Sequence, residues 1–183
     1  MDLASKHLLD GVRVMADALG ETPARVLTLL ALLRLNLAGS RRLAESEQER
    51  LDFDWMADGL SPVPILHLAR HMAAPYESSR RRVVALAEVG LVEMRGDGCR
   101  LHPSVPGARS FRTAARSQAV ATRALIAGDA AAVAEPECLR PFLDGLDFMV
   151  DALVAGISRT RLSATELLIL HRLVGSGRRS VAT

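Results

Sequence analysis

Two prolines and a glycine divide the middle of the chain into short pieces that can form few structures. Pro64 suits the first turn of a helix, where a missing N–H is tolerated, and Pro75 denies helical angles to the residue before it. A first helix must therefore end near Ala73, and a second helix can begin after Pro75. Gly90 can adopt the left-handed conformation that ends a helix, so the second helix should stop there.

The residues after Gly90 have the pattern of a strand that turns back on itself. Residues 91–94 form an apolar–polar run, and Gly96-Asp97-Gly98 is the kind of loop that joins two strands. Two helices separated by a tight turn and followed by a hairpin are the parts of a winged helix-turn-helix.

The same stretch resembles bacterial winged helix-turn-helix transcriptional regulators of the MarR and GntR kinds. Their corresponding run is typically leucine-alanine, two variable residues, leucine-glycine, a turn, threonine-valine-arginine-arginine, a leucine and a terminal glycine-leucine-valine. The matching positions here are, in that order, Leu68-Ala69, Met72-Ala73, Ser78-Ser79-Arg80-Arg81, Leu86 and Gly90-Leu91-Val92.

Two positions depart from that pattern. Ala73 stands where these regulators usually have a turn glycine, and Ser79 stands where they usually have an inward valine. The resemblance covers about residues 22–102 and implies a winged helix-turn-helix fold with double-stranded DNA as the partner. Since some winged helices bind protein instead, the alternative is a protein-interaction adaptor, which the net charge of +2 favours modestly.

The amino-acid composition and the positions of charged residues predict the rest of the fold. Because 49% of the residues are apolar and only 3% are aromatic, the core must consist largely of Leu, Val and Ala. We therefore expect a mainly α fold, a winged helix-turn-helix with a small β-hairpin wing plus additional N- and C-terminal helices. The expected domains are an N-terminal helix at residues 1–21, the winged domain at 22–104 and a helical region at 105–183. The charged residues 39–59 should form a solvated connector that Trp55 pins to the core.

The first two helices have clear signals. Gly20 should end one helix, and Thr22 should cap the next, with Pro23 at its first position. Residues 26–38 are apolar on nearly all sides, which predicts a buried helix, and they are too few to cross a bilayer, which needs about 20 residues. With no signal peptide visible at the amino terminus, we expect a cytoplasmic protein without a membrane partner.

The two ends of the chain resemble each other. Residues 9–19 and 143–153 are identical at seven of eleven positions, and residues 29–35 and 167–173 at five of seven, after a four-residue insertion. The chain therefore looks like one winged unit followed by the opening two helices of a second.

Residues 142–180 are thus expected to be an incomplete second copy of residues 8–42. The apolar faces within residues 142–174 have no helix-turn-helix of their own to cover, so they must pack on the first unit or on another chain. We expect these helices to build an assembly, and the protein to be a homodimer.

The second helix of the motif would be the recognition helix, which enters the major groove of DNA. At about 100° per residue, Arg81 points away from the inward face, where it can bond a guanine bidentately, while Glu77 or Ser78 reads a neighbouring base. Nearby arginines would hold phosphates. The expected DNA-binding residues are Arg70, Tyr76, Glu77, Ser78, Arg80, Arg81, Arg82, Arg95 and Arg100. The expected inward residues are Ser79, Val83, Leu86 and Gly90.

A second basic feature follows the hairpin. No acidic residue occurs between Leu101 and Gly128, and a helix predicted at about residues 109–127 carries four arginines within a narrow arc. The arc is either a solvated polar face or a stripe that tracks the DNA backbone. Its arginines are Arg109, Arg112, Arg116 and Arg123, and the residues expected opposite are Phe111, Ala114, Gln118, Ala121 and Leu125.

Patterns for catalysis are lacking. The serines have no glycine-elbow context, no phosphate-cradling glycine loop is present, and carboxylates cluster only in the charged connector. His67 and His71 lie one helical turn apart without a third ligand, and Cys99 and Cys138 are isolated from each other. We expect no enzyme, metal site or cofactor, and nothing identifies a small-molecule effector, the operator or the sign of regulation.

Overall fold

The computed structural model describes residues 3–47, 52–127, 139–160, 166 and 169. Within these residues the chain is mainly helical with a small two-stranded antiparallel sheet, as the sequence predicts. The strands are β1 (Val92–Arg95) and β2 (Gly98–Leu101). The helices are α1 (Leu3–Leu19), α2 (Pro23–Glu47), α3 (Phe53–Asp58), α4 (Ile65–His71), α5 (Tyr76–Glu88), α6 (Ser104–Gly107), α7 (Arg109–Ala127) and α8 (Arg140–Thr160).

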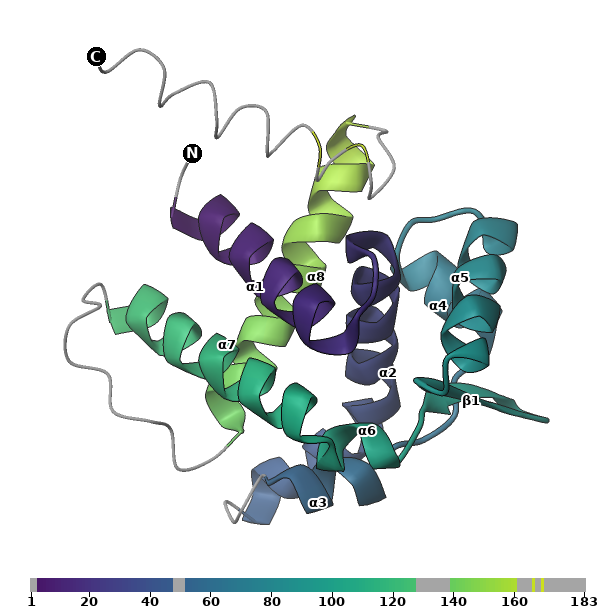
Figure 1. Cartoon of the computed structure of the whole chain (residues 1–183), viewed down its shortest axis with the longest axis horizontal. Coiled ribbons are helices and arrows are strands. Elements are labelled where there is room, and N and C mark those ends of the chain that lie inside the picture. Colours follow the sequence, from purple (N-terminus) through teal and green to yellow (C-terminus); the bar gives the residue numbers. More distant parts are fainter. Residues whose placement is uncertain (1–2, 48–51, 128–138, 161–165, 167–168, 170–183) are drawn as a thin grey trace.

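Helix α2 lies in the middle of the molecule and contacts elements on all sides. It packs against α1 and α8 on one side and against α4, α5 and β2 on the other (Figure 1). Its residues from Val26 to Leu33 are all buried, which confirms the buried helix predicted from its apolar composition. At its start, the carbonyl of Thr22 accepts a hydrogen bond from Val26 N at 3.0 Å.

The prediction of a connector beginning at residue 39 is wrong. Helix α2 continues through Gly39 to Glu47, because most residues beyond Gly39 are good helix formers. Ser40 Oγ donates a hydrogen bond to the carbonyl of Gly59 at 2.8 Å and ties this extension to the end of α3.

Helix α3 is the anchor within the charged segment. The side chain of Asp52 accepts a hydrogen bond from Trp55 N at 2.8 Å and so caps its first turn. Phe53 and Met56 are buried, whereas Trp55 is partly buried against the core. The hydrophobic anchoring is therefore shared, with Phe53 and Met56 placed deeper than the tryptophan.

The turn between α4 and α5 has the boundaries expected from its prolines. Helix α4 ends at His71, and Pro75 precedes the first residue of α5. Ala73 has a φ of 48°, in the left-handed region, where an L-residue with a Cβ is strained. The sequence position at which the resembling regulators carry glycine is thus the position at which glycine would relieve the backbone.

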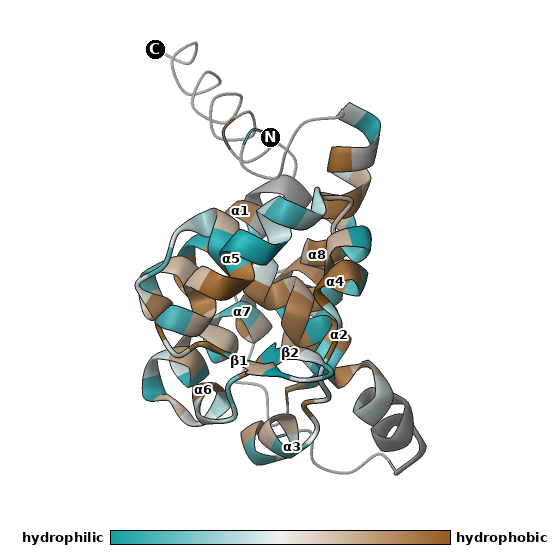
Figure 2. Cartoon of the chain, turned by 90° about the vertical axis from the view of Figure 1, so that its right-hand side faces the viewer, coloured by the Kyte–Doolittle hydropathy of each residue, from teal (hydrophilic) through white to brown (hydrophobic). Residues whose placement is uncertain are grey.

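Helix α5 buries one face and exposes another. Ser79, Val83 and Leu86 are each fully buried, as predicted. The prediction is wrong for Gly90, which is exposed, because α5 ends at Glu88 and Gly90 lies beyond it with a φ of 76°. Figure 2 views the molecule from the side of α4 and α5 and shows hydrophilic segments on α5 interleaved with hydrophobic ones.

The hairpin is tighter than expected and is extended by a third segment. Arg95 pairs with Gly98, so the connecting turn has two residues and Gly98 belongs to β2. Val63 pairs with Cys99 in an isolated antiparallel bridge. A Cβ at Gly98 would lie 2.5 Å from the carbonyl carbon of Val63, so glycine is needed there for the close approach of the two backbones.

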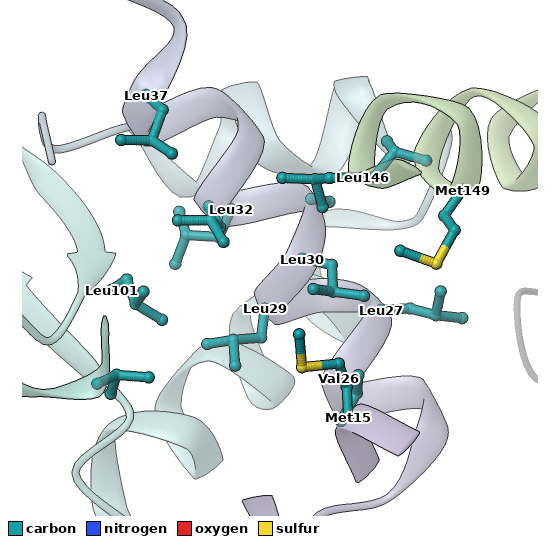
Figure 3. Packing of buried hydrophobic residues seen from close by; sticks show 14 of the residues in the cluster. Met15, Val26, Leu27, Leu29, Leu30, Leu32, Leu37, Leu101, Leu146 and Met149 are labelled. Atoms are coloured by element: carbon teal, nitrogen blue, oxygen red, sulfur yellow. The ribbon is translucent and has the colours of Figure 1, made fainter. Parts of the chain in front are cut away.

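The two repeat helices pack within the same chain. Both α1 and α8 lie against α7 and α2, and Leu146 and Met149 of α8 project toward α2, Met149 toward Leu27 (Figure 3). The apolar face of α8 is therefore covered in cis, which is the first of the two alternatives that the sequence leaves open. The second repeated helix, expected at residues 163–174, lies outside the described residues except for positions 166 and 169.

Two equivalent glycines allow these close crossings. Gly11 of α1 and Gly145 of α8 are both buried, and a Cβ at either position would collide with α7. At Gly11 it would lie 2.4 Å from Gln118 Oε1, and at Gly145 it would lie 2.2 Å from Thr122 Oγ1. The repeated glycine thus has the same role in both copies.

We predict that Ala73→Gly stabilises the protein. Glycine adopts φ near 48° without strain, so the variant should raise the free energy of unfolding by about 1 kcal/mol in urea titrations. The matched control is Ala74→Gly at the next position, which has no left-handed conformation to relieve and should destabilise the fold. Equal effects at both positions would contradict the strain at Ala73.

We also predict opposite effects of alanine at two helical glycines. Gly145→Ala should lower the free energy of unfolding by about 1–3 kcal/mol, because its methyl group overlaps Thr122 of α7. Gly39→Ala has no heavy atom within 4 Å of the added Cβ, so it should gain up to about 1 kcal/mol of helix propensity. Thermal or urea unfolding of the two variants measures the difference, and a stabilised Gly145→Ala protein would refute the close crossing.

Candidate nucleic-acid interface

The outer face of α5 gathers exposed side chains of several kinds. We call this surface the α5 face and define it by Tyr76, Glu77, Arg80, Arg81 and Val84, all of which are exposed. These residues recur at spacings of three and four, so they lie on one side of the helix. Ser78 and Arg82, at the flanks of the face, are half-buried.

Within the α5 face the arginines are not equivalent. Arg80 Nε lies 3.2 Å from Glu77 Oε2, so this guanidinium has a carboxylate partner one turn earlier on the helix. Among the described residues, Arg81, Arg82 and Arg70 form no ion pair. Arg81 therefore presents a full set of donors to an incoming acceptor.

The hairpin carries two arginines that share one carboxylate. Glu93 lies 2.9 Å from Arg95 Nη2 and 2.9 Å from Arg100 Nε. The hydrogen bond from Arg100, and then that from Arg95, lowers the pKa of Glu93. Arg100 also reaches the carbonyl of Leu60 at 3.4 Å, so it holds the hairpin together, while Arg95 is the more exposed of the two.

The arginine stripe of α7 lies apart from the α5 face. Figure 1 shows α7 on the other side of α2 from α5. Arg112 is held by α3, with Nη2 3.3 Å from Asp54 Oδ1 and its guanidinium 5.0 Å from the centre of the Phe53 ring. Arg109, Arg116 and Arg123 are exposed, and Arg123 also has a partner within the structure.

The inward face of α7 differs in part from the expectation. Phe111, Ala114 and Gln118 are buried as predicted, and Leu125 is half-buried. The prediction is wrong for Ala121, which is exposed, because the residues that α1 and α8 cover lie on the neighbouring side of the helix. The further buried positions of α7 are Ala115, Ala119 and Thr122.

The structure places one of the two cysteines and both members of the histidine pair that the sequence analysis considered. Burial raises the pKa of the Cys99 thiol to about 11, so it stays protonated at neutral pH. Cys138 lies outside the described residues. His67 and His71 are both on α4, and within the described part of the chain no third His, Cys, Asp or Glu joins them in a group that could hold a metal ion.

His71 has an unusual environment at the end of α4. Its Nε2 atom is buried and has no hydrogen-bond partner. Burial is the main cause that lowers its pKa, and the charge of Arg34 lowers it further, while Asp151 and Asp147 oppose these effects. The ring is therefore held neutral at the junction of α4, α2 and α8.

Sequence reasoning missed three features of the structure. Val84, 36% exposed, belongs to the α5 face and could have been found from its spacing after Arg80 and Arg81. The ion pairs of Arg34 with Asp147 and Asp151 join α2 to α8 across more than a hundred residues, and no local pattern signals such a contact.

The third missed feature is a buried polar cluster between α1 and α7. His7 Nε2 lies 2.8 Å from Gln118 Nε2 and 3.2 Å from Thr122 Oγ1, and all three residues are buried. Burial also lowers the pKa of His7, which Asp10 partly opposes. The cluster satisfies polar groups in the core and lies away from the α5 face.

Comparisons with protein families, with curated proteins and with solved structures find no match for this chain. None of the described helices is long and apolar enough to cross a membrane.

We predict that acidification destabilises the fold partly through His71. Because the pKa of His71 is lowered in the folded state, the unfolded chain binds a proton more readily below about pH 6.5, and stability is lost as the pH falls through that value. Urea unfolding at pH 7.5 and 5.0 should show a smaller loss for His71→Gln than for the unchanged protein.

His67→Gln is the matched control, since His67 is an exposed histidine one turn earlier on the same helix. An unchanged pH dependence in His71→Gln would contradict the role of His71, and the remaining dependence should then be sought at His7.

Proposed function

We propose that this protein is a DNA-binding transcriptional regulator whose recognition helix is α5. The observation that carries the proposal is Arg81, an exposed arginine without an ion-pair partner among the described residues, at the centre of the α5 face. The order of two helices, a tight turn between them and a following hairpin is that of a winged helix-turn-helix and supports the same reading.

In this proposal α5 enters the major groove and the α5 face reads bases. Arg81 bonds O6 and N7 of a guanine, which is the commonest specific contact of arginine with DNA. Val84 lies one turn further along the same face and suits the methyl group of a thymine. Glu77 neutralises Arg80 in the free protein, so Arg80 becomes available to DNA when Glu77 turns to a base or to water.

The backbone contacts are assigned to arginines around this face. Arg70 of α4, Arg82 of α5 and Arg95 of the hairpin would contact phosphates and set the register of the protein on the duplex. Arg100 contributes by fixing Glu93 and thereby the hairpin. We leave the α7 stripe out of the surface, because Arg112 is committed to Asp54 and Phe53 and α7 lies beyond α2.

A protein-interaction adaptor is the second candidate. It is favoured by apolar side chains that are exposed on α5, just after it and on β1, namely Tyr76, Val84, Val89 and Met94. It is also favoured by the acids of α5 and by the small net charge. Binding to random genomic fragments at increasing salt separates the candidates, since phosphate contacts make DNA affinity fall steeply with salt.

A homodimer remains part of the proposal, on the ground that two recognition helices about 34 Å apart match successive major-groove faces. The sequence suggested a dimer because the apolar faces within residues 142–174 have no helix-turn-helix of their own to cover. For α8 this reason is removed, because α8 packs within its own chain. Light scattering at tens of micromolar without DNA tests it, and a monomer would refute it.

We predict distinct losses of DNA binding for two arginine variants. Arg81→Ala should lose about 1–3 kcal/mol of discrimination between the preferred site and random DNA, because it removes a base contact. Arg95→Ala should weaken binding to all DNA alike and reduce the salt dependence, because it removes a phosphate contact. Gel-shift titrations on a selected site and on random DNA measure both quantities.

Arg116→Ala is the matched control, since Arg116 is an exposed arginine on α7. It should leave both affinities unchanged. The same loss in all three variants would count against the α5 face as the specific surface.

A further inference from the structure

The two repeat helices bury the same face of the same motif. Positions 15 and 149 are both methionines with no exposed surface, and the flanking buried pairs are Val12 with Leu146 and Ala16 with Val150. The repeated glycine seats each helix on α7. The repeated glycine and methionine therefore do not determine which of the two helices packs at which place.

The charged flank of the motif does differ between the copies. In α1 it carries Arg13 and Asp17, whose side chains are 80% and 77% exposed and lie 4.0 Å apart. The equivalent positions of α8 are Asp147 and Asp151. Asp17 and Asp151 are the same residue type, so the sign of the charge changes at the first position alone, from arginine in α1 to aspartate in α8.

Arg34 of α2 meets this flank of α8. Its Nε lies 2.9 Å from Asp147 Oδ1, and its Nη1 and Nη2 lie 2.5 and 3.3 Å from the two carboxylate oxygens of Asp151. The Arg34 side chain is only 22% exposed, so water screens it weakly. A helix of the α1 type at this place would bring Arg13 against Arg34, and two guanidinium groups would share a poorly solvated space.

We define the α8 seat by Arg34 of α2 and by Thr122 of α7, against which Gly145 packs, and we infer that Arg34 selects the helix that packs there by the sign of its charge. The seat accepts a helix with glycine followed by aspartate two and six residues later, which is the pattern of Gly145, Asp147 and Asp151, and Arg34 rejects the α1 type. The occupant is α8 of the same chain, and the ion pairs of Arg34 exclude α1 from its place.

Side-chain size is the competing reason for the selection. Residues 146, 148 and 150 of α8 are Leu, Phe and Val, whereas the equivalent residues of α1 are Val, Val and Ala. A test must therefore change the charge at the discriminating position while leaving these sizes as they are. The inference does not depend on DNA binding, and its test uses no DNA.

The first experiment measures peptide binding to the full chain. Asp147→Arg in the full chain should loosen its own α8, and fluorescence anisotropy then reports the binding of labelled peptides. A peptide of residues 139–160 should bind at least ten-fold more tightly than one of residues 3–20. Arg13→Asp in the second peptide should recover at least three-fold of that difference. Equal binding of the unchanged peptides, or no gain from Arg13→Asp, would overturn the inference and point to size.

The second experiment is a charge exchange within the full chain, and it remains informative if Asp147→Arg alone does not fold. Arg34→Asp places a carboxylate beside two aspartates and should lower the melting temperature. Adding Asp147→Arg restores an opposite pair across the same contact, so the double variant should recover at least half of the loss. A double variant that melts no higher than Arg34→Asp would show that Arg34 does not select its partner by charge, and the inference would be wrong.

Discussion

The fold depends on burying residues 26–37 of α2 on nearly every side. That burial is possible because the side-chain amide of Asn36, which lies in the core, has all its hydrogen-bond partners. Asn36 donates from Nδ2 to the carbonyls of Ser61 and Cys99, at 2.7 and 3.3 Å, and its Oδ1 accepts from Leu101 N at 2.9 Å. A buried amide without partners would cost several kcal/mol, whereas this one fixes the hairpin to α2. The segment before α4 and strand β2 are therefore positioned by the same side chain.

This arrangement gives the α5 face a firm support. Helix α5 packs on α2, with Val83 and Leu86 buried, and strand β2 of the hairpin that follows α5 is held by Asn36. The exposed side of α5 therefore projects from two elements that share one anchor. A surface for reading DNA needs such support because a base contact is lost when a side chain shifts by about 1 Å. The weak point is the turn, where Ala73 holds a left-handed conformation two residues after His71, whose buried Nε2 has no hydrogen-bond partner.

The parts of the fold that follow from local chemistry could be predicted from the sequence. Pro75 and Gly90 restrict the backbone only of nearby residues, so the ends of α4 and α5 could be predicted from the sequence. The continuation of α2 past Gly39 was not, because an exposed glycine within a run of helix formers weakens a helix without ending it. The partners of Arg100 and Arg112 could not be predicted either, since a helical or strand spacing gives the direction of a side chain but not what a distant segment brings to it.

The repeat shows the same limit in a sharper form. Similarity between α1 and α8 was enough to predict that both bury one face, since the apolar residues around Met15 and around Met149 have the same helical spacing. It was not enough to predict where α8 docks, because both faces are apolar and differ only in side-chain size at residues 146, 148 and 150. In our inference, charge supplies the difference that distinguishes the two helices, because it has a sign and acts over a longer range than apolar contact. The residue that supplies the difference must lie on the receiving helix, facing the one position where the copies carry opposite charges. Arg34, the one arginine within residues 26–37 of α2, meets that condition at Asp147, and this ion pair is compatible with its low exposure.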